Sequence, residues 1–108
     1  MKKEYNKLVR DKIPEKLERA FQTTHTRKLS GKDLEVQLER LLLTEVQEYH
    51  REKTVDKLAD IVEVVYALAK IKGISKEELE FKKTTKLISD GSYDEGIYLE
   101  FTEHGPMK

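Results

Sequence analysis

The sequence has no cysteine, no tryptophan and only two prolines among its 108 residues. Without cysteine there can be no disulfide, no thiol nucleophile and no thiolate metal site. The 21 basic and 21 acidic residues leave no net charge that would attract DNA or an anionic membrane. No uninterrupted apolar run approaches the roughly 18 residues that a membrane span needs, and the opening MKKEYNKLVRDK lacks the apolar stretch of a signal peptide. We therefore expect a soluble, cytoplasmic protein that binds neither nucleic acid nor membrane.

The size and composition favour one folded domain over residues 1–108. A chain of 12.7 kDa is long enough for a single core. Only 37% of the residues are hydrophobic and 39% are charged, but the two signs of charge balance. Disordered chains with so few apolar residues usually carry a large net charge, so the balance indicates a folded protein with a charged surface.

Helix start and stop signals divide most of the chain into four helices. Proline is favoured in a first helical turn, serine and threonine at N-caps, and glycine just after a helix. Ser75 followed by Glu78 also forms a capping-box pattern. The predicted helices run from Pro14 to about Phe21, from Ser30 to about Glu52, from Thr54 to a stop at Gly73, and from Ser75 to about Ile88.

The C-terminal residues follow a different pattern. After the turn signal Asp90-Gly91, the apolar residues Ile97, Leu99 and Phe101 alternate with polar neighbours, which indicates a short strand or extended arm. One strand cannot form a sheet, and four helices with short connections typically form an antiparallel bundle. The predicted fold class is all-α, an antiparallel four-helix bundle with a short C-terminal extended arm.

Glu45 lies in an unusual position on the second predicted helix. The apolar residues of this helix recur at the spacing of one face, and Glu45 falls on the same line as Leu34, Leu38 and Leu41, with Glu48 one turn further on at its edge. A carboxylate among leucines must be paired, protonated or bound to a cation. The full predicted inward stripe is Leu34, Leu38, Leu41, Leu42, Val46 and Tyr49.

The third predicted helix is apolar on nearly every side between Val55 and Ala69, so we expect it to be central or to lie in a subunit interface. Its acidic residues Asp56, Asp60 and Glu63 nevertheless share one side. One interpretation is an acidic cluster that complements the helix dipole and meets lysines. The other is that Glu45, Glu48, Asp60 and Glu63 surround a divalent cation, for which oxygen-only ligands favour Mg²⁺ or Mn²⁺ over zinc.

Three segments of the chain resemble a known family. The opening YNKLVRDKIPE, the segment LADIVEVVYALAKIKGIS and, more loosely, GSYDEGIYL are similar to a small branch of the MazG-like all-α nucleoside-triphosphate pyrophosphohydrolases. This superfamily includes phosphoribosyl-ATP pyrophosphohydrolase and the dimeric dUTPases. The resemblance covers nearly the whole chain.

The resemblance implies a metal site with two departures. The family pattern is Glu-Glu-x-x-Glu on one helix and Glu-x-x-Asp on the next. This chain keeps Glu45, Glu48 and Asp60 as ligands, but Thr44 and Lys57 replace the other two glutamates. Near the C-terminus, where the branch has Lys-x-x-x-Arg-Gly-Gly-aromatic, the chain keeps a lysine and an aromatic residue and lacks the arginine.

The activity implied by the resemblance is Mg²⁺-dependent hydrolysis of a nucleoside triphosphate to its monophosphate and pyrophosphate, often to remove non-canonical nucleotides. Glu48 or Glu63 would hold the attacking water. Beside the ligands, Asp56 is a further nearby carboxylate. The predicted phosphate- and nucleotide-binding residues are Arg10, Lys12, Lys86 and Tyr93.

Two further expectations concern Lys57 and assembly. In a non-catalytic alternative, Lys57 pairs with Asp60 and Glu63 in the place of the cation, and the protein is a nucleotide sensor or protein-interaction module. In either case the apolar third helix predicts a homodimer or higher homo-oligomer, because three short helices would not cover it. Alternatively, the arm around Ile97, Leu99 and Phe101 folds back over it.

Overall fold

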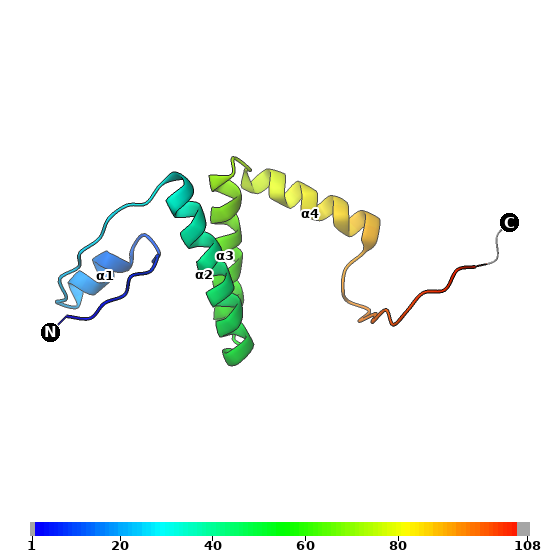
Figure 1. Ribbon diagram of the computed structural model, residues 1–108, viewed down its shortest axis with the longest axis horizontal. Helices are drawn as coiled ribbons and strands as arrows, with labels where there is room; N and C mark the ends of the chain where they lie inside the picture. The colour runs from blue at the N-terminus through cyan, green and yellow to red at the C-terminus, as the bar shows by residue number, and fades with distance from the viewer. Residues whose placement is uncertain (1, 106–108) are drawn as a thin grey trace. The chain divides into compact units, whose positions relative to one another are not determined.

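The computed structural model describes residues 2–105, and helices are the regular secondary structure over that range (Figure 1). It confirms the predicted all-α class, because no strand occurs among these residues. The chain divides into two compact units, the first ending at Lys76 and the second beginning at Glu77. A single domain and a four-helix bundle both stay predictions. The helices are α1 (Ile13–Arg19), α2 (Gly31–Glu52), α3 (Val55–Ile71) and α4 (Lys76–Asp90).

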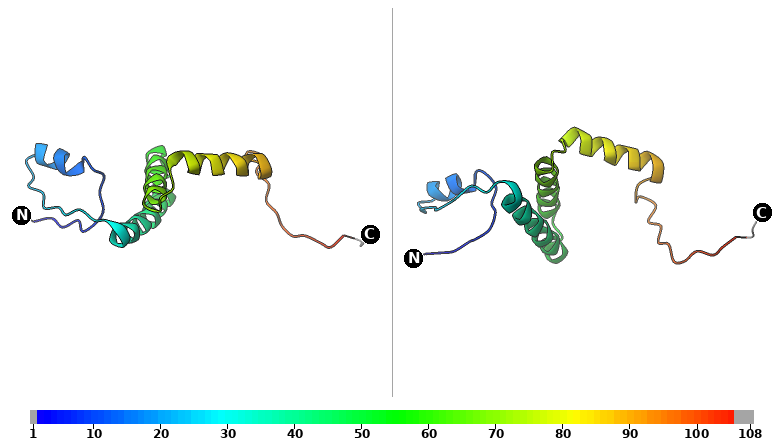
Figure 2. Two further views of the ribbon diagram at one scale, coloured as in Figure 1. Left: turned by 90° about the horizontal axis from the view of Figure 1, so that it is seen from above. Right: turned by 45° about the horizontal axis from the view of Figure 1, so that its top comes forward.

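The helices α2 and α3 pack against each other and form the centre of the first unit (Figure 2). Lys57 at the start of α3 pairs with Glu48 near the end of α2, whereas Lys72 just after α3 pairs with Glu35 near the start of α2. The two helices are therefore antiparallel. This arrangement brings the two acidic motifs of the sequence to the same end of the pair.

The turn between α2 and α3 is only two residues long. Lys53 ends α2 in the left-handed region at φ 58°, and its N–H donates to the Tyr49 carbonyl at 2.7 Å. Thr54 is the N-cap of α3, as predicted, and its Oγ1 accepts from the Lys57 N–H at 3.3 Å. The short connection fixes the last turns of α2 beside the first turns of α3.

The predicted stop at Gly73 is also confirmed. Gly73 has φ +80°, its N–H donates to the Lys70 carbonyl, and the Ile74 N–H donates to the Ala69 carbonyl at 2.8 Å. These two bonds form the Schellman motif that ends many helices. Glycine suits this position because a left-handed backbone strains residues that carry a Cβ.

The core of the α2–α3 pair is small. Leu38, Val64 and Ala69 are buried, and the other members of the predicted α2 stripe are half-buried except Val46, which is exposed. The prediction of an inward Val46 was wrong, because the covered side of α2 is narrower than the apolar stripe. On α3 the apolar residues Val55, Leu58 and Val62 are exposed, so α2 covers only one side of this helix.

The second unit consists of α4 from Glu77 onward and the residues that follow this helix. The helix ends at Asp90, two residues beyond the predicted Ile88. The next residue, Gly91, has φ +87°, and its N–H donates to the Leu87 carbonyl. Ile97, Leu99 and Phe101 are exposed and lie outside any strand, which favours the extended-arm form of the prediction. None of the helices over residues 2–105 combines the length and apolar character that crossing a bilayer requires.

Candidate functional site: a carboxylate cluster around Lys57

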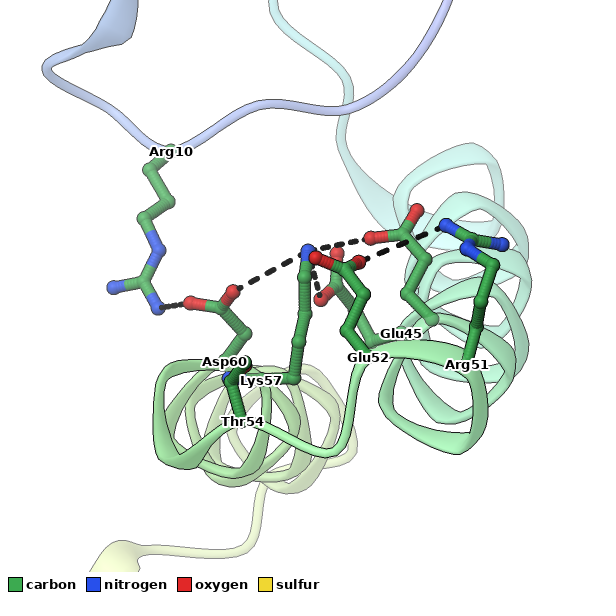
Figure 3. Close-up of polar contacts among 8 residues, drawn as sticks. Arg10, Glu45, Arg51, Glu52, Thr54, Lys57 and Asp60 are labelled. Atoms are coloured by element: carbon green, nitrogen blue, oxygen red, sulfur yellow. Dashed lines mark hydrogen bonds and ion pairs between the residues drawn. The ribbon is translucent and has the colours of Figure 1, made fainter.

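Three carboxylates converge on the side-chain ammonium of Lys57 (Figure 3). The Nζ atom donates to Glu48 Oε1 at 2.5 Å and lies 3.5 Å from Glu45 Oε2 and 3.9 Å from Asp60 Oδ2. The side chains of Glu45 and Glu48 come from α2 and those of Lys57 and Asp60 from α3. A single cationic group thus joins both helices through their predicted ligand residues.

Helix geometry explains why these side chains meet. Glu45 and Glu48 are three residues apart on α2, and Lys57 and Asp60 are three apart on α3, so each pair projects from one side of its helix. The two-residue turn holds the two sides next to each other. In Figure 3 the Lys57 side chain extends from α3 to a position between Asp60 and Glu45.

Glu45 is the most deeply placed of the three carboxylates. Its side chain is 14% exposed, and Oε2 is buried without a hydrogen bond from the described residues. A buried acceptor without a hydrogen bond is costly. The ammonium of Lys57, at 3.5 Å, compensates its charge but lies closer to Glu48. The sequence-based prediction that Glu45 is partly withdrawn from water agrees with this position.

The N-terminal segment reaches the same cluster through Arg10. Its Nη2 atom donates to Asp60 Oδ1 at 2.7 Å, across fifty positions of sequence. Asp60 therefore lies between two cations, Arg10 on one side and Lys57 on the other (Figure 3). Three carboxylates face two cationic groups, so the cluster keeps one negative charge in excess.

The short bond between Lys57 and Glu48 shifts the titration of both groups. The hydrogen bond from Lys57 lowers the pKa of Glu48 below its ordinary value, and the same bond raises the pKa of Lys57. Both groups therefore stay charged at neutral pH. A carboxylate with a lowered pKa is a weaker proton acceptor, so this state of Glu48 is not that of a strong general base.

The cluster fits a divalent cation by the chemistry of its donors. Carboxylate oxygens are the ligands that Mg²⁺ and Mn²⁺ prefer, and Glu45 offers a buried oxygen that lacks a hydrogen bond. The distances around Lys57 are those of an ammonium group, since Mg²⁺ binds oxygen at about 2.0–2.1 Å. As the side chains stand, no three acidic or histidine groups over residues 2–105 are placed to hold a metal together.

The remaining predicted site residues lie outside this cluster. Glu63 and Asp56 are on α3 and exposed, and Glu63 takes no part in the ion pairs of the described chain around Lys57. Lys12 is the exposed N-cap of α1. Lys86 and Tyr93 belong to the second unit, where Tyr93 is 98% exposed. The roles of these five residues stay predictions.

One ion pair that sequence reasoning missed lies at the other end of the helix pair. Lys72 Nζ donates to Glu35 Oε2 at 2.6 Å, and this bond lowers the pKa of Glu35 and raises that of Lys72. Opposite charges near the start of one helix and the end of the next are the signal that could have found it, because antiparallel packing brings those ends together.

Comparison of the chain with protein-family models, curated proteins and solved structures finds no match.

Proposed function

We propose that the protein is a MazG-like nucleoside-triphosphate pyrophosphohydrolase that acts with Mg²⁺ or Mn²⁺, with removal of non-canonical nucleotides as one use. The observation that supports this proposal most strongly is the convergence of Glu45, Glu48 and Asp60 from two helices on one cation position. These are the same three ligands that the sequence resemblance implies.

In the proposed reaction, Glu45, Glu48 and Asp60 would hold the divalent ion. When bound, this ion would neutralise charge on the pyrophosphate leaving group. Arg10, at the rim of the cluster, would place its guanidinium against phosphate oxygens, because its fork of N–H donors matches phosphate geometry. Lys12, Lys86 and Tyr93 remain the further candidates for nucleotide contacts.

The water that attacks the nucleotide needs a carboxylate to orient it. Glu48 can do so only after the hydrogen bond from Lys57 is broken, since that bond lowers its pKa. Glu63 is one turn beyond Asp60 and exposed, so it is the alternative water-holding residue. The attack would release pyrophosphate and leave the nucleoside monophosphate.

The experiment that tests this proposal measures pyrophosphate release from a panel of canonical and modified triphosphates, with Mg²⁺ and with Mn²⁺. We expect release from at least one substrate and its loss in Glu48→Gln. Glu39→Gln is the matched control, because Glu39 is exposed on the same helix. No release across the panel would contradict the enzymatic proposal.

The position of Lys57 favours a second candidate function. Because its ammonium already pairs with all three carboxylates, the same structure suits a non-catalytic nucleotide-binding or protein-interaction module. On sequence grounds Lys57 is expected to pair with Glu63 in this candidate. In the structure Lys57 pairs with Glu45 and Glu48 of α2 instead. Nucleotide binding by calorimetry without pyrophosphate release would support it.

We also propose that the protein is a homodimer. The exposed stripe Val55, Leu58 and Val62 on α3 lies on the side that α2 does not cover. A second copy with twofold symmetry would bury two such stripes at once. Association through this stripe would leave the carboxylate cluster on the covered side of α3 intact.

A further inference from the structure

The Lys57 ammonium lies among the three carboxylates that are proposed to hold a divalent ion. Its Nζ atom lies within 4 Å of carboxylate oxygens from Glu45, Glu48 and Asp60. A divalent ion bound by the same three carboxylates must occupy nearly the same point. An ammonium group and a divalent ion cannot share it, because they would repel at contact distance.

The charges around this point can be neutralised either by the Lys57 ammonium or by a divalent ion. With Lys57 and Arg10 in place, the three carboxylates carry one uncompensated negative charge. Without the ammonium they would carry two, which matches the charge of one divalent ion. Like charges held together at such distances destabilise a structure, so the cluster requires one cation or the other.

Two observations indicate that the ammonium satisfies the three carboxylates incompletely and is not enclosed. Glu45 Oε2 remains buried without a hydrogen bond, 3.5 Å from Nζ. The Lys57 side chain is 21% exposed, so its flexible four-carbon stem has a path toward water. A cation that contacted all three carboxylates more closely would neutralise them more completely than the ammonium does.

We propose that Lys57 is a tethered cation that competes with a divalent ion for Glu45, Glu48 and Asp60, so that the site is closed to metal until this side chain turns out to solvent. This inference rests on the proposed function only for the identity of the ligands. It assigns to Lys57 an autoinhibitory contact, and it makes the helix pair stable without metal.

The test is titration of the protein with Mn²⁺ alone, followed by calorimetry and by thermal unfolding, with no nucleotide present. Removing the ammonium in Lys57→Gln should tighten Mn²⁺ binding at least about tenfold, since the ion no longer displaces a charge. Lys57→Glu, which adds a fourth carboxylate, should bind at least as tightly as Lys57→Gln. Lys57→Arg keeps the positive charge and should bind Mn²⁺ as weakly as the unaltered protein.

Lys70→Gln is the matched control, because Lys70 is exposed on the same helix, about 20 Å along it from Lys57. It removes the same charge and should leave Mn²⁺ affinity unchanged. Equal Mn²⁺ affinity in Lys57→Gln and Lys70→Gln would overturn the inference, and so would a Lys57→Gln protein that stays unfolded at every Mn²⁺ concentration. Tighter Mn²⁺ binding by Lys57→Gln without pyrophosphate release from any variant would support the competition and contradict the proposed hydrolase.

Discussion

Replacing Leu38 with alanine tests how much the packing of α2 against α3 contributes to the stability of the protein. Leu38 is 5% exposed and is the buried residue of α2. The change removes about three methylene-sized groups, worth about 0.8 kcal/mol each, and leaves a cavity that adds to the loss. We expect the free energy of unfolding to fall by about 3 kcal/mol, which lowers the Tm by about 12–24 °C.

The matched control is Leu43→Ala on the same helix. Leu43 is 66% exposed, so the same chemical change should cost less than about 0.5 kcal/mol. Both variants should be unfolded by heat and followed by circular dichroism at two protein concentrations. A contribution from subunit association depends on concentration, whereas the loss at Leu38 does not. Equal losses in the two variants at both concentrations would refute the packing described here.

Three further predictions concern the metal, an ion pair and the exposed stripe. In thermal unfolding, saturating Mg²⁺ should raise the Tm of the unaltered protein and of the control Glu39→Gln but not the Tm of Glu45→Gln. A full Mg²⁺ response in Glu45→Gln would show that Glu45 is not a ligand. The hydrogen bond from Lys72 lowers the pKa of Glu35. The ion pair between Lys72 and Glu35 therefore stabilises the fold when the pH is above the ordinary pKa of glutamate, and this stabilisation is lost as the pH falls through the folded-state pKa of Glu35. On acidification from about pH 5, the Tm of the unaltered protein should therefore fall more steeply than the Tm of Glu35→Gln. Parallel curves of Tm against pH for the two proteins would contradict this. Light scattering should give a mass near twice 12.7 kDa for the protein and near 12.7 kDa for Val62→Lys; a monomeric unaltered protein would exclude the dimer.

Local sequence signals predicted the helices of the first unit well. Thr54 and Gly73 are the cap and the stop of α3, because a side-chain oxygen and a missing Cβ each satisfy the backbone at a helix end. The left-handed Lys53 was not predicted, since lysine gives no signal for that conformation. Its strain persists because the surrounding turn fixes it between two long helices.

The pairing across the helices could be predicted only in part. The position of Glu45 among leucines indicated a partly buried carboxylate, and the structure places it so. The partners of Lys57 depend on the rotation of α3 against α2, and an apolar pattern on every side of α3 does not define that rotation. Of the two predicted partners of Lys57, Asp60 does pair with it, but Glu63 does not, because six residues along the same helix turn Glu63 to another side of α3. Glu48 of α2 pairs with Lys57 instead.

The position of Lys57 links the stability of the helix pair to the proposed metal binding. A site with four carboxylates repels itself and needs a divalent ion to hold its helices close. In this protein the ammonium joins Glu45 and Glu48 on α2 to Asp60 on α3, so the helix pair is held without an ion. If Lys57 competes with a divalent ion as proposed, the side chain that stabilises the fold also opposes metal binding, and any gain in metal affinity through Lys57 costs stability in the metal-free protein. Fold stability and metal affinity should change in opposite directions across the Lys57 variants.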